Sequence, residues 1–143
     1  MIRATGDTNV LAPTIRRVGQ TRSVVAPILG AWKARNYELV LSEYVLSEIR
    51  RVLATPYFSR YLKPPDLDAA IETFRADATI IPITVVVEGA ATHPGDDLIL
   101  ATALSGQADY LVTLDRQLLA LESHGGVRIV TPHAFLTTLA AES

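Results

Sequence analysis

Four acidic side chains stand at the end or rim of apolar segments: Asp7, Glu48, Asp96 and Asp115. A carboxylate that is buried or half-buried is costly unless it is paired or bound to a cation. Four such residues, each beside a core-forming segment, suggest a single acidic pocket. Carboxylate oxygens are the ligands that hard divalent cations prefer, so the pattern predicts a divalent metal site.

The segments that must position these acids alternate between two kinds of pattern. Strand-like apolar runs cover residues 2–5, 37–41, 79–83, 110–113 and 127–130, and helical patterns cover residues 23–35, 42–53, 65–78, 96–105, 116–122 and 132–140. Strands that alternate with helices predict a mainly parallel sheet covered on both faces. We therefore expect an α/β fold, a three-layer α/β/α sandwich around a central twisted sheet, with residues 1–143 forming a single domain.

Two of the acids are placed by the strands. Asp7 follows the first predicted strand and Asp115 follows the fourth. The carboxyl ends of parallel strands meet at the same edge of a sheet, where sites collect, so these two carboxylates are expected to lie near each other. Thr113 precedes Asp115 by two residues, and the pleat of a strand points residues so spaced to one side.

Helical phase places Glu48. It lies at the rim of an apolar stripe, three residues after Val45 and four before Val52. The stripe therefore allows Glu48 to lean over the sheet edge. By the same phase, three other charged residues of this helix fall away from the stripe: Glu43, Arg50 and Arg51.

Helical phase also separates the adjacent acids Asp96 and Asp97. Asp96 shares a face with Ile99, Leu100 and Ala103, whereas Asp97 is rotated about 100° away. Asp96 is therefore the expected pocket residue. Asp97 is expected to cap the helix, to bind an outer water or to be solvated. Taken singly, each of the four acids has an ordinary structural explanation as a turn, cap or rim residue; it is their coincidence that favours a site.

Composition sets limits on the class of protein. The chain has 143 residues, of which 49% are hydrophobic and 20% charged, which is typical of a globular domain. It has no cysteine, so disulfides and thiolate metal sites are excluded. No apolar run reaches the roughly 18 residues of a membrane helix, and a charged Asp7 interrupts the place of a signal peptide. We expect a cytoplasmic protein without a membrane partner.

The basic residues are nearly all arginine, although the net charge is −2. Arginine binds phosphate with better geometry than lysine does, because its planar guanidinium can donate two parallel hydrogen bonds. Local phosphate contacts are therefore one reading of these side chains, and a solvated surface is the other. The candidates are Arg16, Arg17, Arg22, Arg50, Arg51 and Arg116.

Four segments together resemble a PIN domain. They read DTNVL at 7–11, SEYVLSEI at 42–49, PGDDLILATA at 94–103 and DYLVTLD at 109–115. Their order, their spacing and the chain length are similar to those of single-domain PIN proteins, which include the VapC-type toxins of toxin–antitoxin systems. The resemblance covers nearly the whole chain.

The resemblance implies an endoribonuclease that depends on Mg²⁺ or Mn²⁺ and acts on single-stranded RNA, with a cognate antitoxin as a partner. The acidic set carried over by position is Asp7, Glu48, Asp96 and Asp115, supported by the hydroxyl of Thr113. Thr8 and Asn9 are expected to order the loop after Asp7, and Asp97 to support the pocket from outside. RNA contacts are assigned to Arg16, Arg17, Arg22 and Arg116. A homodimer is expected, and the aromatic stretch YFSRY at 57–61 suits a dimer or antitoxin surface.

Three points stay open. Gly6 precedes Asp7 and weakens a strand interior, so Asp7 is expected to be held less rigidly than in the family pattern. A PIN-like scaffold that binds RNA or a partner without cutting is an alternative. An aspartyl-phosphate receiver domain is a second alternative, but it needs a lysine near the end of a late strand, and the two lysines, Lys33 and Lys63, lie in the first half.

Overall fold

A parallel sheet forms the centre of the chain. The computed structural model describes residues 1–142 apart from 17–25, 61 and 92. The strands in this part are β1 (Arg3–Gly6), β2 (Glu38–Leu41), β3 (Thr79–Ile80), β4 (Tyr110–Val112), β5 (Ser123–His124) and β6 (Val127–Val130). Their order in the sheet is β3-β2-β1-β4-β6-β5, and β5 alone among them is antiparallel to its neighbour. The predicted α/β class and mainly parallel sheet are confirmed.

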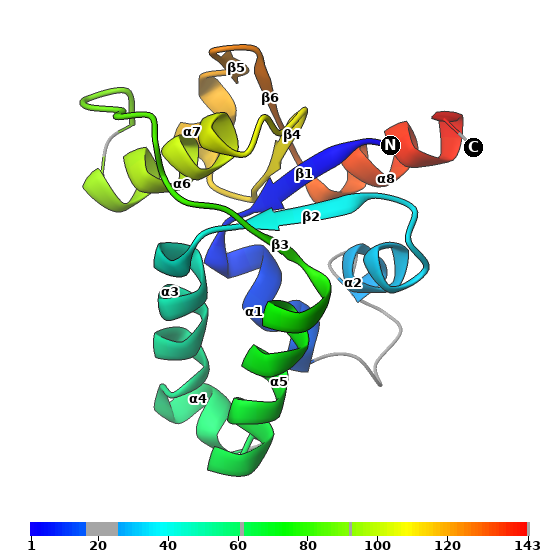
Figure 1. Cartoon of the computed structure of the whole chain (residues 1–143), viewed down its shortest axis with the longest axis vertical. Helices are drawn as coiled ribbons and strands as arrows, with labels where there is room; N and C mark the ends of the chain where they lie inside the picture. The colour runs from blue at the N-terminus through cyan, green and yellow to red at the C-terminus, as the bar shows by residue number, and fades with distance from the viewer. Residues whose placement is uncertain (17–25, 61, 92, 143) are drawn as a thin grey trace.

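Helices cover both faces of this sheet. They are α1 (Thr8–Arg16), α2 (Ala26–Lys33), α3 (Glu43–Leu53), α4 (Pro56–Ser59), α5 (Pro64–Asp77), α6 (Pro94–Ser105), α7 (Arg116–Ala120) and α8 (Pro132–Glu142). Figure 1 shows α6 and α7 on one side of the sheet and α1, α2, α3 and α5 on the other. In the same view the arrowheads of β1 and β2 point towards the side on which α3 and α6 lie. The carboxyl ends of the strands therefore open between these helices.

Apolar strand residues and the inner faces of the helices make one core. Leu39 and Leu41 of β2 are buried, as are Ile49 of α3 and Leu100 of α6. Several aromatic residues belong to this core rather than to a binding surface: Trp32 stacks on Phe74, with ring centroids 5.3 Å apart, and Tyr37 meets Phe135 edge-on. Burial of side chains this large contributes roughly 2 to 3 kcal/mol each, so these rings stabilise the fold.

Two helices begin within one residue of the predicted position, at residues that suit a helix start. Ser42 precedes α3, and its hydroxyl accepts a hydrogen bond from the Val45 N–H. Such a cap satisfies one of the free N–H groups at the start of a helix. Pro64 and Pro65 open α5, where a missing N–H has little cost.

The structure adds or shortens elements relative to the sequence-based prediction, and the start of one predicted helix lies outside the described residues. Residues 8–16 form α1, which the sequence pattern did not indicate, and the first part of the helix predicted at 23–35 lies outside the described residues. The strand predicted at 79–83 ends at Ile80. Pro82 has no N–H to donate, and the N–H groups of Thr84 and Val85 bond to the Ser105 hydroxyl instead of to a strand.

Gly6 is the last residue of β1 and remains paired in the sheet. It pairs with Val112 of β4, and a Cβ placed on it would come 3.4 Å from the Leu11 side chain. The residue is thus paired and closely packed on the strand that leads to Asp7.

In the described part of the chain, every helix is too short or too polar to cross a membrane.

Candidate active site

An open cavity of about 310 Å³ lies at the carboxyl edge of the sheet. All four acids identified from the sequence line it, although they come from four separate parts of the chain. The lining residues are Asp7, Thr8, Asn9, Tyr44, Glu48, Arg51, Val52, Gly95, Asp96, Ile99 and Asp115. The expectation that the four carboxylates share one pocket agrees with this geometry.

Asp7 is the most deeply placed of the four, with 4% of its surface exposed. One carboxylate oxygen accepts a hydrogen bond from the Thr113 hydroxyl, and the other accepts one from the Val10 N–H at 3.1 Å. The pKa of Asp7 is raised to about 6: burial raises it most, the charges of Asp96 and Asp115 raise it less, and the two hydrogen bonds lower it. The effect of burial on the pKa therefore outweighs that of the hydrogen bonds, and a nearby cation would stabilise the ionised form of Asp7.

Thr113 connects Asp7 to Asp115. Its buried hydroxyl donates to Asp7 and accepts the Asp115 N–H at 3.0 Å. Asp115 in turn caps α7, because its Oδ1 accepts the N–H groups of Gln117 at 2.8 Å and Leu118 at 3.0 Å. Thr113 does not line the cavity itself; it fixes the two strand-end acids relative to each other.

Glu48 reaches the cavity from α3 and is held by two neighbours that the sequence analysis did not place there. Its carboxylate accepts a hydrogen bond from the Arg51 Nε at 2.7 Å, and the Tyr44 hydroxyl interacts with it. Burial raises the pKa of Tyr44, and the charge of Glu48 raises it further. Helical spacing could have identified both neighbours, since residues three and four positions from Glu48 lie on the same face of the helix. Arg51 is exposed and lies away from the apolar stripe, as predicted, but its long side chain still reaches Glu48.

Asp96 and Asp97 separate as helical phase predicts. Asp96 lines the cavity at the start of α6; burial raises its pKa, with a further contribution from the charge of Asp115. Asp97 is absent from the lining and accepts the N–H groups of Gly89 at 3.0 Å and Ala91 at 2.8 Å. Asp97 therefore anchors the loop that precedes α6.

Thr8 and Asn9 line the cavity, but they do not belong to a loop. They form the first turn of α1, which begins directly after Asp7. The Val10 N–H bonds to the Asp7 side chain, so that Asp7 caps this helix. We expected an ordered loop here, but the structure has the start of a helix, and the Val10 N–H of this helix holds the Asp7 side chain.

The four carboxylates share a cavity without yet forming a closed ligand cage. Among the described His, Asp and Glu residues, no three are close enough together to hold a metal ion as they stand. The charges of Asp96 and Asp115 nevertheless raise the pKa of Asp7, and the charge of Asp115 raises that of Asp96. Like charges that interact in this way attract a cation to the space between them.

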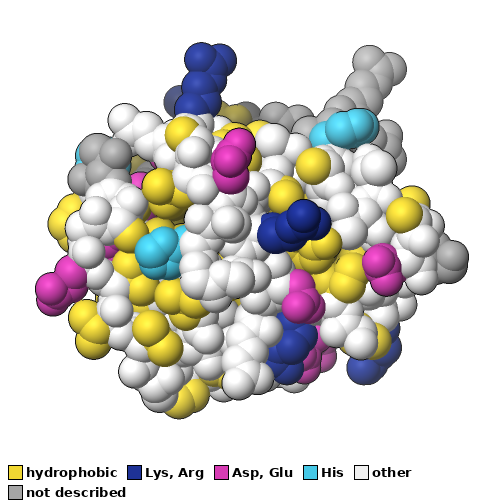
Figure 2. All heavy atoms as spheres, turned by 90° about the horizontal axis from the view of Figure 1, so that it is seen from above, with side chains coloured by type: hydrophobic (Ala, Val, Ile, Leu, Met, Phe, Trp, Pro, Cys, Tyr) yellow, Lys and Arg dark blue, Asp and Glu magenta, His cyan; other side chains and the backbone are white. Residues whose placement is uncertain are grey.

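Of the arginines singled out from the sequence, Arg51 alone lines this cavity among the side chains that the structure describes. Arg116 is exposed on α7 and is absent from the lining. Arg17 and Arg22 lie outside the described residues, as does the side chain of Arg16. Figure 2 shows one face of the molecule on which basic and acidic side chains are interspersed, without a continuous basic surface among the coloured residues.

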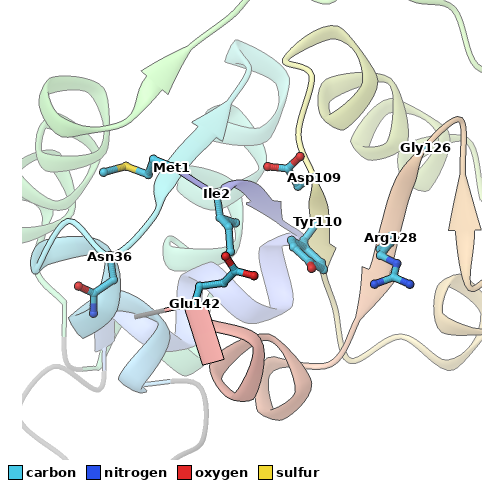
Figure 3. A pocket seen from close by; sticks show the side chains of 8 residues that line it. All are labelled: Met1, Ile2, Asn36, Asp109, Tyr110, Gly126, Arg128 and Glu142. Carbon is cyan, nitrogen blue, oxygen red and sulfur yellow. The ribbon is translucent and has the colours of Figure 1, made fainter. Parts of the chain in front are cut away.

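A larger hollow of about 690 Å³ lies at the opposite edge of the sheet, beside the amino ends of β1 and β4 (Figure 3). Asp109 and Glu142 bring carboxylates to it from separate elements. Asp109 is already engaged, because its Oδ2 accepts the N–H of Arg3 at 2.9 Å. This hollow lacks the convergence of acids that the carboxyl edge has.

Comparisons with known proteins agree with the geometry. A family model described as a PIN domain matches residues 3–117. Among solved structures, one similar chain comes from the crystal structure of VapBC2 from Rickettsia felis bound to a DNA fragment from their promoter. The TM-score is 0.59 at 17% identity, over 90% of this chain and 97% of that one. A search of functionally curated proteins gave no match.

Proposed function

This chain belongs to the PIN domain family, and from that premise we propose that it is a metal-dependent endoribonuclease. The proposed reaction is hydrolysis of phosphodiester bonds in single-stranded RNA, with Mg²⁺ or Mn²⁺ as the cofactor. The observation that carries the proposal is the convergence of Asp7, Glu48, Asp96 and Asp115 on one cavity at the carboxyl edge of the sheet.

The donors present suit such a cation. The lining offers four carboxylates, beside the Tyr44 hydroxyl and Arg51, and Mg²⁺ prefers oxygen ligands. Mg²⁺ also keeps several waters and needs only one or two direct carboxylates. Mg²⁺ is therefore compatible with a cavity in which no three described acids lie close together.

The proposed roles follow from the contacts of each acid. Asp7, Asp96 and Asp115 would hold the cation, since their charges act on one another across the cavity. Thr113 positions Asp7 and Asp115, because its hydroxyl contacts both. When bound, the cation supplies the positive charge that activates a water and offsets charge on the leaving oxygen. One of the cavity carboxylates would accept the proton of the attacking water.

We further propose that the protein acts as the toxin of a toxin–antitoxin pair and works as a homodimer. The structural similarity to a chain of the VapBC2 complex supports an assembly of this kind. Tyr57, which is 53% exposed beside the buried Phe58, offers part of a protein-binding surface. Tyr61 of the same stretch lies outside the described residues.

The second candidate is a PIN-like scaffold that binds RNA or a partner without cutting. The intact set of four cavity acids disfavours it, because a binding surface for a polyanion gains nothing from four carboxylates.

A cleavage assay separates the two candidates. Purified protein is incubated with a fluorescently labelled pool of single-stranded RNA of randomised sequence, with Mn²⁺, with Mg²⁺ or with EDTA, and the products are resolved on a gel. We expect cleavage with either metal and none with EDTA, and none with Asp96→Asn purified in the same way. Binding without metal-dependent cleavage would support the scaffold instead.

A further inference from the structure

Arg51 is the one cationic residue that lines the acidic cavity among the side chains that the structure describes. Its Nε donates to the Glu48 carboxylate at 2.7 Å, in an ion pair within α3. The two partners differ in exposure: 69% of the Arg51 side chain is accessible, against 25% for Glu48. Glu48 is therefore the more enclosed of the two, and Arg51 is the more solvent-exposed part of the same lining.

Most of the donors of this guanidinium are uncommitted. An arginine carries five N–H groups in a flat fork, and Glu48 engages the one on Nε. The Nη groups have no acceptor among the described residues and remain accessible to solvent. Fixed at one edge and open at the other, the fork is pre-organised to accept an oxyanion such as phosphate.

Electrostatics create a need for such a group. An RNA backbone carries one negative charge per phosphate, and the cavity that must receive it carries four carboxylates. A single divalent cation does not neutralise four acids. The remaining negative charge repels a phosphate that approaches the cavity, and Arg51 supplies a cation in the lining that can offset this repulsion.

We propose that Arg51 binds a backbone phosphate of the RNA substrate at the mouth of the acidic cavity while its Nε remains on Glu48. This inference rests on the proposed ribonuclease function and adds a substrate-binding residue to it. Arg51 orients the strand so that the neighbouring phosphodiester bond enters the cavity.

Arg50 is a matched control. It occupies the next position of α3, and its Nη1 pairs with Asp68 of α5 at 2.9 Å. Arg50 does not line the cavity. Arg50→Gln therefore removes the same charge from the same helix without touching the proposed phosphate site.

The test measures binding separately from cleavage. A fluorescein-labelled pool of single-stranded RNA of randomised sequence is titrated with the full-length protein by fluorescence anisotropy, with Ca²⁺ in place of Mg²⁺. A gel run afterwards verifies that the probe is intact. Kd is measured at several salt concentrations for the wild type, Arg51→Gln, Arg51→Lys and Arg50→Gln. Calorimetric titration with Mn²⁺ gives the metal affinity of each variant.

We expect Arg51→Gln to raise Kd by roughly tenfold, as for loss of a charge-assisted hydrogen bond. Its plot of log Kd against log salt should lose about one unit of slope, which corresponds to one phosphate contact. Arg51→Lys should restore part of the affinity, Arg50→Gln should match the wild type, and the Mn²⁺ affinity of Arg51→Gln should stay within a few-fold of wild type.

An unchanged salt slope for Arg51→Gln overturns the inference, as does a loss confined to Mn²⁺ affinity, because Arg51 would then only orient Glu48. Cleavage by the wild type separates the two proposals. If the wild type cleaves RNA with metal and Arg51→Gln binds as the wild type does, this inference alone fails. If the wild type neither binds nor cleaves, the ribonuclease proposal fails, and the role of Arg51 fails with it.

Discussion

Asp7→Asn is expected to stabilise the metal-free protein at neutral pH, although it removes a residue of the proposed site. The ionised Asp7 carboxylate is buried beside two other acids, and burial raises its pKa to about 6 from 3.8. Asparagine keeps the shape of the side chain and removes the charge. Its amide oxygen can still accept the Val10 N–H, and its amide nitrogen can donate to the Thr113 hydroxyl oxygen, so the two contacts of Asp7 are replaced rather than lost.

The magnitude follows from linkage. The folded protein binds the Asp7 proton more tightly than the unfolded chain, so the stability contributed by this group is complete below about pH 3.8 and is lost as pH rises through 6. One pKa unit corresponds to about 1.4 kcal/mol, so the ionised form lowers the free energy of unfolding by roughly 3 kcal/mol at neutral pH. At about 3 °C per kcal/mol for a domain of this size, Asp7→Asn should raise Tm by up to roughly 9 °C.

The assay is thermal unfolding in EDTA from pH 4 to pH 8. The Tm of Asp7→Asn relative to that of the wild type should rise with pH through this range, and the difference should become constant above about pH 7. The exposed Asp66, converted to Asn, is the control and should show little difference from the wild type. With Mn²⁺ added the order should reverse, because a cation stabilises the carboxylate and not the amide. A difference that does not change with pH, or an Asp7→Asn protein less stable than wild type at pH 8, would refute this reasoning.

Three further substitutions test contacts in the site and elsewhere in the fold. Thr113→Val removes the hydroxyl that connects the two strand-end acids; we expect a loss of roughly 1 to 3 kcal/mol by urea unfolding and reduced cleavage, with Thr113→Ser largely restoring both. Gly106→Ala should be more damaging than an ordinary surface change, since its Cβ would lie 2.3 Å from a Val40 methyl group; a cost of roughly 1 to 3 kcal/mol by urea unfolding is expected, and a neutral result contradicts the packing. Asp97→Asn should lower stability by about 1 kcal/mol while cleavage persists, because Asp97 holds a loop; equal loss of cleavage at Asp96 and Asp97 would contradict their separation.

Much of the site could be predicted because the periodicity of a helix or strand determines on which side of the element each side chain lies. Asp7 and Asp115 follow strands of one parallel sheet, so their positions at one edge depend only on recognising the strands. Glu48 and Asp96 depend on helical phase, which a clear apolar stripe makes reliable. These are properties of regular elements, and the tertiary structure did not alter them.

The rest depends on contacts that no local pattern records. The helix α1 contains Pro13, which argues against a helix interior, and its first turn is capped by Asp7, a residue that also serves the site. Arg51 points away by phase, yet its flexible side chain returns to Glu48. Asp97 accepts N–H groups from a loop six and eight residues earlier, and only the folded path of that loop makes this possible.

The most direct test of the central proposal, that four separate acids act as one cation site, is calorimetric titration of the metal-free protein with Mn²⁺ at neutral pH. The wild type should bind saturably, Asp96→Asn should lose most of the affinity, and Asp97→Asn should bind nearly as the wild type does. No saturable binding by the wild type, or full affinity in Asp96→Asn, would contradict the proposed metal site.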